Sequence, residues 1–279
     1  MRAEAAGGFS FPELEDSRLA SGDAGALRRR RQRRQRHGAG APQAQAMAAP
    51  AAVQRLYEAC REVFTGAAPG AVPPPADVER IKSILDSITA ADVCLTPNMS
   101  YFRCADPRGT PKITYLHLYK CEAFSIGIFC LPSRGVIPLH NHPGMTVFSK
   151  LLFGAMHVKS YDWAAARKDT PGPRLAKVKV DGILTAPHET LILYPEDGGN
   201  MHCFTAQNAC AVLDVLGPPY DDDSGRHCQY YNVSSFAISD GGSTLLPEGD
   251  RYEWLEESEQ PQDFSLVGST YMGPRILDH

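Results

Sequence analysis

Apolar residues begin to recur at a helical spacing about fifty residues into the chain. The spacing predicts an amphipathic helix whose buried face is formed by Val53, Leu56, Tyr57, Cys60, Val63 and Phe64. The stretch PGAVPPP ends this helix. A second helix is predicted to follow, with Asp77 as its N-cap and an apolar face formed by Val78, Ile81, Ile84, Leu85 and Ile88. Both helices are expected to serve packing.

Beyond Lys112 the apolar positions take the period of β-strands. At least seven short segments are rich in β-branched and aromatic residues: KITYLHLY, EAFSIGIFCL, MTVFSKLLFG, AMHVKSYDW, KVKVDGILTA, ETLILYP and CAVLDVLG. No long helix separates them, so the fold class is predicted to be all-β, an antiparallel sandwich or barrel with short N-terminal helices. After Asp221 the pattern thins, which predicts a loop over residues 221–229 and irregular surface structure over 241–263.

Residues 1–50 differ from the rest of the chain in composition. They are rich in Ala, Gly, Gln and Arg without apolar periodicity, which predicts a disordered arm before a single domain over residues 51–279. The arm carries nine arginines and five acidic residues, a charge of +4. Since the whole chain has a charge of −4, residues 51–279 carry −8. The run Arg28–Arg36 is dense enough to bind an anionic surface or a nuclear import receptor; a solvated arm without a partner is the alternative. A plastid or mitochondrial transit peptide is a third reading, which the five acidic residues disfavour. The acidic body does not indicate nucleic-acid binding.

The cysteines and the absence of targeting signals bear on the compartment. The chain has eight cysteines and no C-x-x-C pair, no run of eighteen apolar residues, and no apolar segment of the kind that a secretory signal needs. We therefore expect reduced thiols, no membrane span, and a location in the nucleus and cytoplasm. No heptad or interface stripe is visible, so a monomer is expected.

Two histidines stand one residue apart in PLHNHPGM. In a strand, residues i and i+2 face the same side, so His140 and His142 would project together while Asn141 points away, and Pro143 would end the strand. A third histidine, His202, follows a glycine-rich turn in GGNMHCFTA. This two-part arrangement resembles a cupin jelly roll. The glutamate ligand usual in cupins is missing, since Thr146 and Val147 occupy its expected positions.

Three longer segments extend the resemblance: PLHNHPGMTVFSKLLFGAMHVKSYDW, GGNMHCFTA and AVLDVLGPPYDD. They closely resemble plant cysteine oxidases, which are cupin thiol dioxygenases related to animal cysteamine dioxygenase. The resemblance covers about residues 53–279 and leaves out the arm. It implies a dioxygenase that uses Fe(II) and O2 to convert the N-terminal cysteine of proteins to cysteine sulfinic acid. The implied substrates include group VII ethylene-response transcription factors, which would link the chain to the N-degron pathway and to hypoxia sensing.

The ligand set suits this chemistry. Three imidazoles leave a divalent metal its full charge, which favours an incoming thiolate and leaves positions for sulfur and oxygen. The product is the sulfinic acid level of thiol oxidation, and no external electron donor is needed. Three histidines also make a catalytic zinc site, so the spacing leaves zinc open, and iron follows from the resemblance alone.

Two further residues are candidates for catalysis. Asp214 interrupts the apolar segment AVLDVLG, where an unpaired carboxylate would be costly. We expect it to accept the free N–H of His202 from a neighbouring strand, with hydrogen bonds to backbone amides as the alternative. Tyr220, after Pro218 and Pro219, is expected at the mouth of the site, where its phenol would donate to bound oxygen or shape the substrate channel; a rim tyrosine is the alternative. Cys228 is expected to be a plain thiol.

Three functions of different classes remain in view. The first is the Fe(II) dioxygenase acting on protein N-terminal cysteine, for which free cysteine is the less favoured substrate. The second is a non-enzymatic metal- or ligand-binding cupin. The third is a zinc or manganese cupin isomerase or hydrolase. The missing glutamate favours the first over the third, and the complete set of three histidines speaks against the second.

Overall fold

The computed structural model describes residues 51–104, 109–164, 172–234 and 249–278. The predicted arm over residues 1–50 lies outside them. Two helices, α1 (Ala52–Phe64) and α2 (Pro75–Ser87), and two short 3-10 helices, η1 (Ala90–Val93) and η2 (Ser100–Phe102), precede the strands. The described residues contain no helix long and apolar enough to cross a membrane.

The strands form two sheets. One is six-stranded, in the order β12 (Leu266–Ser269), β1 (Ile113–Lys120), β2 (Ser125–Leu131), β9 (Cys210–Gly217), β4 (Thr146–Phe153) and β7 (Leu191–Leu193). The other closes on itself in the order β10 (Tyr230–Ser234), β11 (Tyr252–Ser258), β6 (Arg174–Thr185), β5 (Ala155–Trp163), β8 (Met201–Ala206) and β3 (Val136–His140). The predicted all-β jelly roll with N-terminal helices is confirmed.

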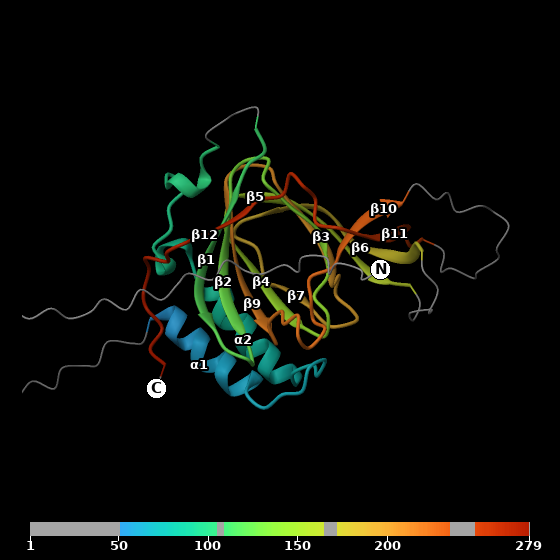
Figure 1. Ribbon diagram of the computed structural model, residues 1–279. Coiled ribbons are helices and arrows are strands. Elements are labelled where there is room, and N and C mark those ends of the chain that lie inside the picture. The colour runs from blue at the N-terminus through green and yellow to red at the C-terminus, as the bar shows by residue number, and fades with distance from the viewer. Residues whose placement is uncertain (1–50, 105–108, 165–171, 235–248, 279) are drawn as a thin grey trace, which may run out of the picture.

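The alternation of side chains along β9 explains the layering. Leu213 and Val215 join the cluster that includes α1 and α2, which lie against one face of the six-stranded sheet (Figure 1). Val212 faces the other way and packs with Phe204 from β8 in the interior between the two sheets. Because successive residues point to opposite faces, Asp214 also faces this interior.

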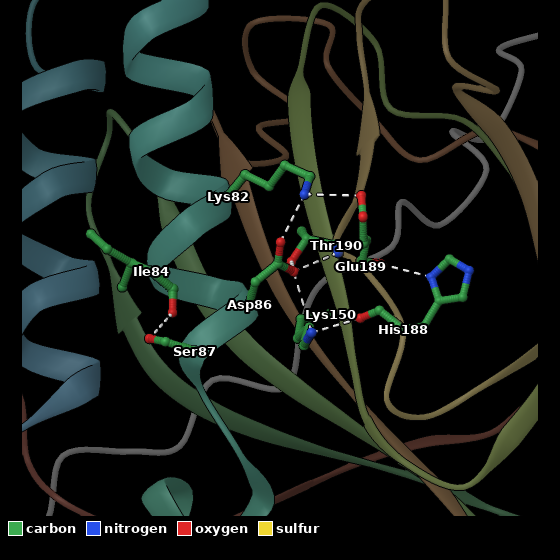
Figure 2. Close-up of polar contacts among 8 residues, drawn as sticks. All are labelled: Lys82, Ile84, Asp86, Ser87, Lys150, His188, Glu189 and Thr190. Atoms are coloured by element: carbon green, nitrogen blue, oxygen red, sulfur yellow. Dashed lines mark hydrogen bonds and ion pairs between the residues drawn. The ribbon is translucent and has the colours of Figure 1, made fainter.

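An ion cluster fastens α2 to the six-stranded sheet. Asp86, near the end of α2, accepts hydrogen bonds from the Thr190 amide at 2.8 Å and the Thr190 hydroxyl at 2.7 Å. Lys82 lies 2.8 Å from its second oxygen, and the buried Lys150 of β4 lies 3.3 Å from its first (Figure 2). Lys150 also donates to the His188 carbonyl at 2.6 Å.

Three local predictions were wrong. Asp77 is not the N-cap of α2: Pro74 holds that position, and Asp77 lies in the first turn, where its charge still suits the helix dipole. The strand that carries His140 ends there, so His142 lies in the following turn. Residues 241–263 are not uniformly irregular, because β11 pairs with β6 and β10; only Leu255 of β11 is buried, which leaves little apolar pattern to detect.

Candidate metal centre

The three predicted histidines come together between the sheets. His140, the last residue of β3, stands opposite His202 of β8 in the ladder, and His142 reaches the same point from the turn. Each offers one ring nitrogen, and these atoms all lie within 4.8 Å of one another. All three side chains are buried. The strand pairing therefore produces the convergence that the sequence spacing predicted.

Hydrogen bonds determine which nitrogens are free. His140 Nδ1 lies 2.8 Å from the Pro138 carbonyl, which can only accept, so Nδ1 carries the proton and Nε2 keeps its lone pair. Tyr220 donates its hydroxyl proton to the Asn141 carbonyl at 2.7 Å, so His142 Nδ1, 2.9 Å away, donates to Tyr220. His142 Nε2 is consequently free, and it is buried without a partner.

Electrostatics keeps these rings neutral. Burial lowers the pKa of His140 to about 4. Burial and the neighbouring histidines hold the pKa values of His142 and His202 well below their usual range. His202 Nδ1 is also buried without a hydrogen-bond partner. Neutral imidazoles with unpartnered buried nitrogens fit a divalent cation, and the cluster that lies within 4.8 Å includes no carboxylate from the described residues.

A narrow cavity adjoins the histidines. Its walls are largely apolar and include Ile137, Phe204, Leu216 and Phe264. Among the described residues that line it, Asp214 carries the only carboxylate, and there is no lysine or arginine. A ligand in this cavity would thus meet hydrophobic walls, one acid and the histidine cluster.

Asp214 faces the cavity as expected, but its predicted partner was wrong. It lies in β9, between β2 and β4 of the six-stranded sheet, whereas His202 lies in the other sheet. His202 Nδ1 and Asp214 Oδ1 are each buried without a hydrogen bond, so the expected bond between them is not formed. Burial raises the pKa of Asp214 to about 7. Its Oδ1 is therefore available to a ligand rather than committed to His202.

Tyr220 lies deeper than predicted. Its side chain is buried rather than placed at the rim, and its hydroxyl fixes the ring of His142. Burial, followed by the adjacent Cys228, raises its pKa well above the usual value, so the phenol stays protonated. Cys228, which also lines the cavity, is a free, buried thiol whose pKa burial raises to about 12.

The sequence reasoning missed Asn200 and Tyr230. Tyr230 lines the cavity, and it belongs to a strand in the region where the pattern thins. Asn200 binds the backbone of His142 through its side-chain amide. The only signal for Asn200 was its place between the glycine turn and His202.

Comparisons with known proteins identify the family of the chain. Residues 84–276 match the PCO_ADO family. Plant cysteine oxidase 2 of Arabidopsis thaliana is 54% identical over 81% of this chain and 83% of its own length, and plant cysteine oxidase 1 is 53% identical over 81% of each. Human 2-aminoethanethiol dioxygenase is 32% identical over 73% of this chain and 82% of its own length. The chain therefore belongs to the PCO_ADO family of thiol dioxygenases.

Proposed function

We propose that the chain uses Fe(II) and O2 to convert the N-terminal cysteine of protein substrates to cysteine sulfinic acid. The observation that carries the proposal is the cluster of three buried, neutral histidines with free nitrogens. It adjoins a cavity whose described lining residues include one carboxylate, that of Asp214. His140, His142 and His202 would hold the ion. Bound there, ferrous iron would supply the redox chemistry by which both atoms of O2 join the thiolate sulfur, with no other reductant.

The walls of the cavity support a particular substrate end. Asp214 would accept hydrogen bonds from the α-ammonium group of the cysteine, since its Oδ1 is buried without a partner. No lysine or arginine among the described lining residues would pair with an α-carboxylate. A cysteine whose carboxyl group is in a peptide bond therefore fits better than free cysteine, which would have to bury an unpaired charge.

Tyr220 contributes by orientation. By accepting a hydrogen bond from His142 Nδ1–H and donating to the Asn141 carbonyl, it keeps Nε2 directed at the cluster. Apolar residues such as Phe204 and Leu216 exclude water around the reacting groups. The chain's own residues thus bind the metal and the substrate, orient His142 and exclude water from the reacting groups.

The proposed cellular role follows from the substrate. Sulfinic acid at an N-terminal cysteine would direct proteins such as group VII ethylene-response transcription factors to the N-degron pathway, so the enzyme would act in hypoxia sensing in the nucleus and cytoplasm. The relatives named plant cysteine oxidases support cysteine oxidation, on which this role depends. We propose a monomer that binds neither nucleic acid nor membrane.

Mass spectrometry of a cysteine-initiated peptide, incubated with the full chain, Fe(II) and air, tests the proposal. We expect a gain of two oxygen atoms on the cysteine. An N-acetylated peptide and free cysteine should react far more slowly, because the first lacks the ammonium group and the second adds an unpaired carboxylate. Activity with zinc in place of iron, or equal rates on all three thiols, would contradict it.

A further inference from the structure

The backbone of His142 lacks a strand partner. β3 ends at His140, so the ladder with β8 no longer serves the residues that follow. His142 is nonetheless buried, and a buried N–H or C=O without a partner costs free energy. Another group must therefore fix this peptide.

The side-chain amide of Asn200 takes the place of the missing strand. His142 N–H donates to Asn200 Oδ1 at 2.9 Å, and Asn200 Nδ2 donates to the His142 carbonyl at 2.9 Å. The same Nδ2 donates to the Tyr194 carbonyl at 2.8 Å. The His142 carbonyl has one further, longer bond from the Met145 amide at 3.3 Å, whereas its N–H depends on Asn200. Asn200 is 7% exposed.

Hydrogen bonds to β5 fix the backbone of Asn200. Asp162 of β5, also buried, accepts the Gly199 amide at 2.9 Å and the Asn200 amide at 3.2 Å through one oxygen. Gly199 has a φ of +84°, and a Cβ there would lie 2.4 Å from Ser160 Oγ, so the turn requires glycine. The amide of Asn200 is therefore presented from a fixed turn two residues before His202.

We infer that Asn200 is a positioning residue that sets the separation of His142 and His202 before any ion binds, by clamping the backbone of one to the segment that carries the other. This inference rests on the proposed metal site. Groups that orient ligands typically change metal affinity about 10- to 100-fold when removed. We expect Asn200→Ala to weaken Fe(II) or Co(II) binding by at least about tenfold.

The chain offers a matched control in Gln54. This residue is 9% exposed, and its amide grips one backbone residue in the same way: Leu277 N–H donates to Oε1 at 2.8 Å, and Nε2 donates to the Leu277 carbonyl at 3.1 Å. It lies in α1 and does not line the cavity. Gln54→Ala removes the same kind of contact, so it separates a structural loss from a loss of ligand positioning.

The test is anaerobic titration of the full chain with Fe(II) and with Co(II), alongside the thermal midpoint and the Co(II) absorption spectrum. We expect both variants to lower the midpoint, but only Asn200→Ala to weaken metal binding and shift the Co(II) bands. Equal metal affinities in Asn200→Ala and Gln54→Ala would overturn the inference. If Asn200→Ala does not fold, Asn200→Ser is judged by the same criterion. Failure of the unaltered chain to bind either ion would instead overturn the proposed function.

Discussion

Two polar clusters, one partly exposed and one buried, handle their hydrogen bonds in opposite ways. In the ion cluster that docks α2, both oxygens of Asp86 are occupied by Lys82, Lys150 and Thr190. In the histidine cluster, His142 Nε2 and His202 Nδ1 are buried without partners. Buried polar groups are normally satisfied, so a protein that fills one cluster and leaves the other incomplete reserves the second for a ligand.

The charges differ in the same sense. Burial opposes ionisation of Asp86, but its bonds to Lys82, Thr190 and Lys150 outweigh burial and hold its pKa well below the usual range. At the histidines, burial dominates and the neutral form prevails. In the Asp86 cluster the carboxylate charge is balanced by two lysines. In the histidine cluster the rings are uncharged, so no positive charge opposes a bound cation. Substitutions should therefore affect stability at the first cluster and metal binding at the second.

The largest expected effect is that of His202→Ala. Removing one of three nitrogen donors should reduce metal binding and peptide oxidation to background. Elemental analysis and the peptide assay measure both. His157→Ala is the control, since His157 Nε2 pairs with Asp181 away from the cavity, and this variant should keep its metal. Metal retention by His202→Ala would contradict the assignment of the histidine cluster as the metal site.

Asp214→Asn should retain most of the metal but lower turnover by about 10- to 100-fold, the effect of losing a hydrogen bond between charged groups. The amide is similar in size but has no charge to offer the substrate ammonium group. The loss should be smaller on N-acetylated peptide, which already reacts slowly without that group. Metal content and steady-state kinetics on both peptides measure this; full activity on the free N-terminus would rule out the role.

Asp86→Asn should lower the free energy of unfolding by about 2 kcal/mol, because hydrogen bonds to a charged group are lost. Metal affinity of the folded protein should not change. Asp250→Asn, which breaks the more exposed pair with Lys177, should cost less than about 1 kcal/mol. Denaturant unfolding measures both. A change in metal affinity in Asp86→Asn would show that the two clusters are not independent.

Tyr220→Phe should weaken metal binding by about tenfold, because His142 Nδ1 loses its acceptor while the ring stays in place. Tyr161→Phe provides the control: its hydroxyl donates to Glu253 at 2.7 Å outside the cavity. Titration with Co(II) would compare the two. Identical affinities would mean that the hydroxyl does not orient His142.

The smallest effect concerns pH. The folded-state pKa of Asp86 is depressed, so its contribution to stability is present above the unfolded value of about 4 and is lost as pH falls toward the folded value. The difference in unfolding free energy between the unaltered chain and Asp86→Asn should be constant from about pH 7 to pH 5 and shrink below about pH 4. A constant difference at all pH values would contradict the assigned pKa.

The sequence predicted the parts that depend on local periodicity. The apolar stripe from Val53 to Phe64 gave α1, and the apolar segment around Asp214 gave β9. The absence of the expected bond between Asp214 and His202 could not be predicted, because it depends on β9 joining β2 and β4 rather than β8. Tyr220 and Asn200 were misplaced or missed for the same reason: their contacts are to residues 141–142, more than fifty positions away.

The most direct test of the central claim is X-ray absorption of the anaerobic Fe(II)-loaded chain, before and after a cysteine-initiated peptide is added. We predict a shell of nitrogen and oxygen donors that includes three imidazoles, and one new iron–sulfur distance once the peptide binds. A sulfur donor already present without peptide, or a shell that the peptide leaves unchanged, would contradict the account.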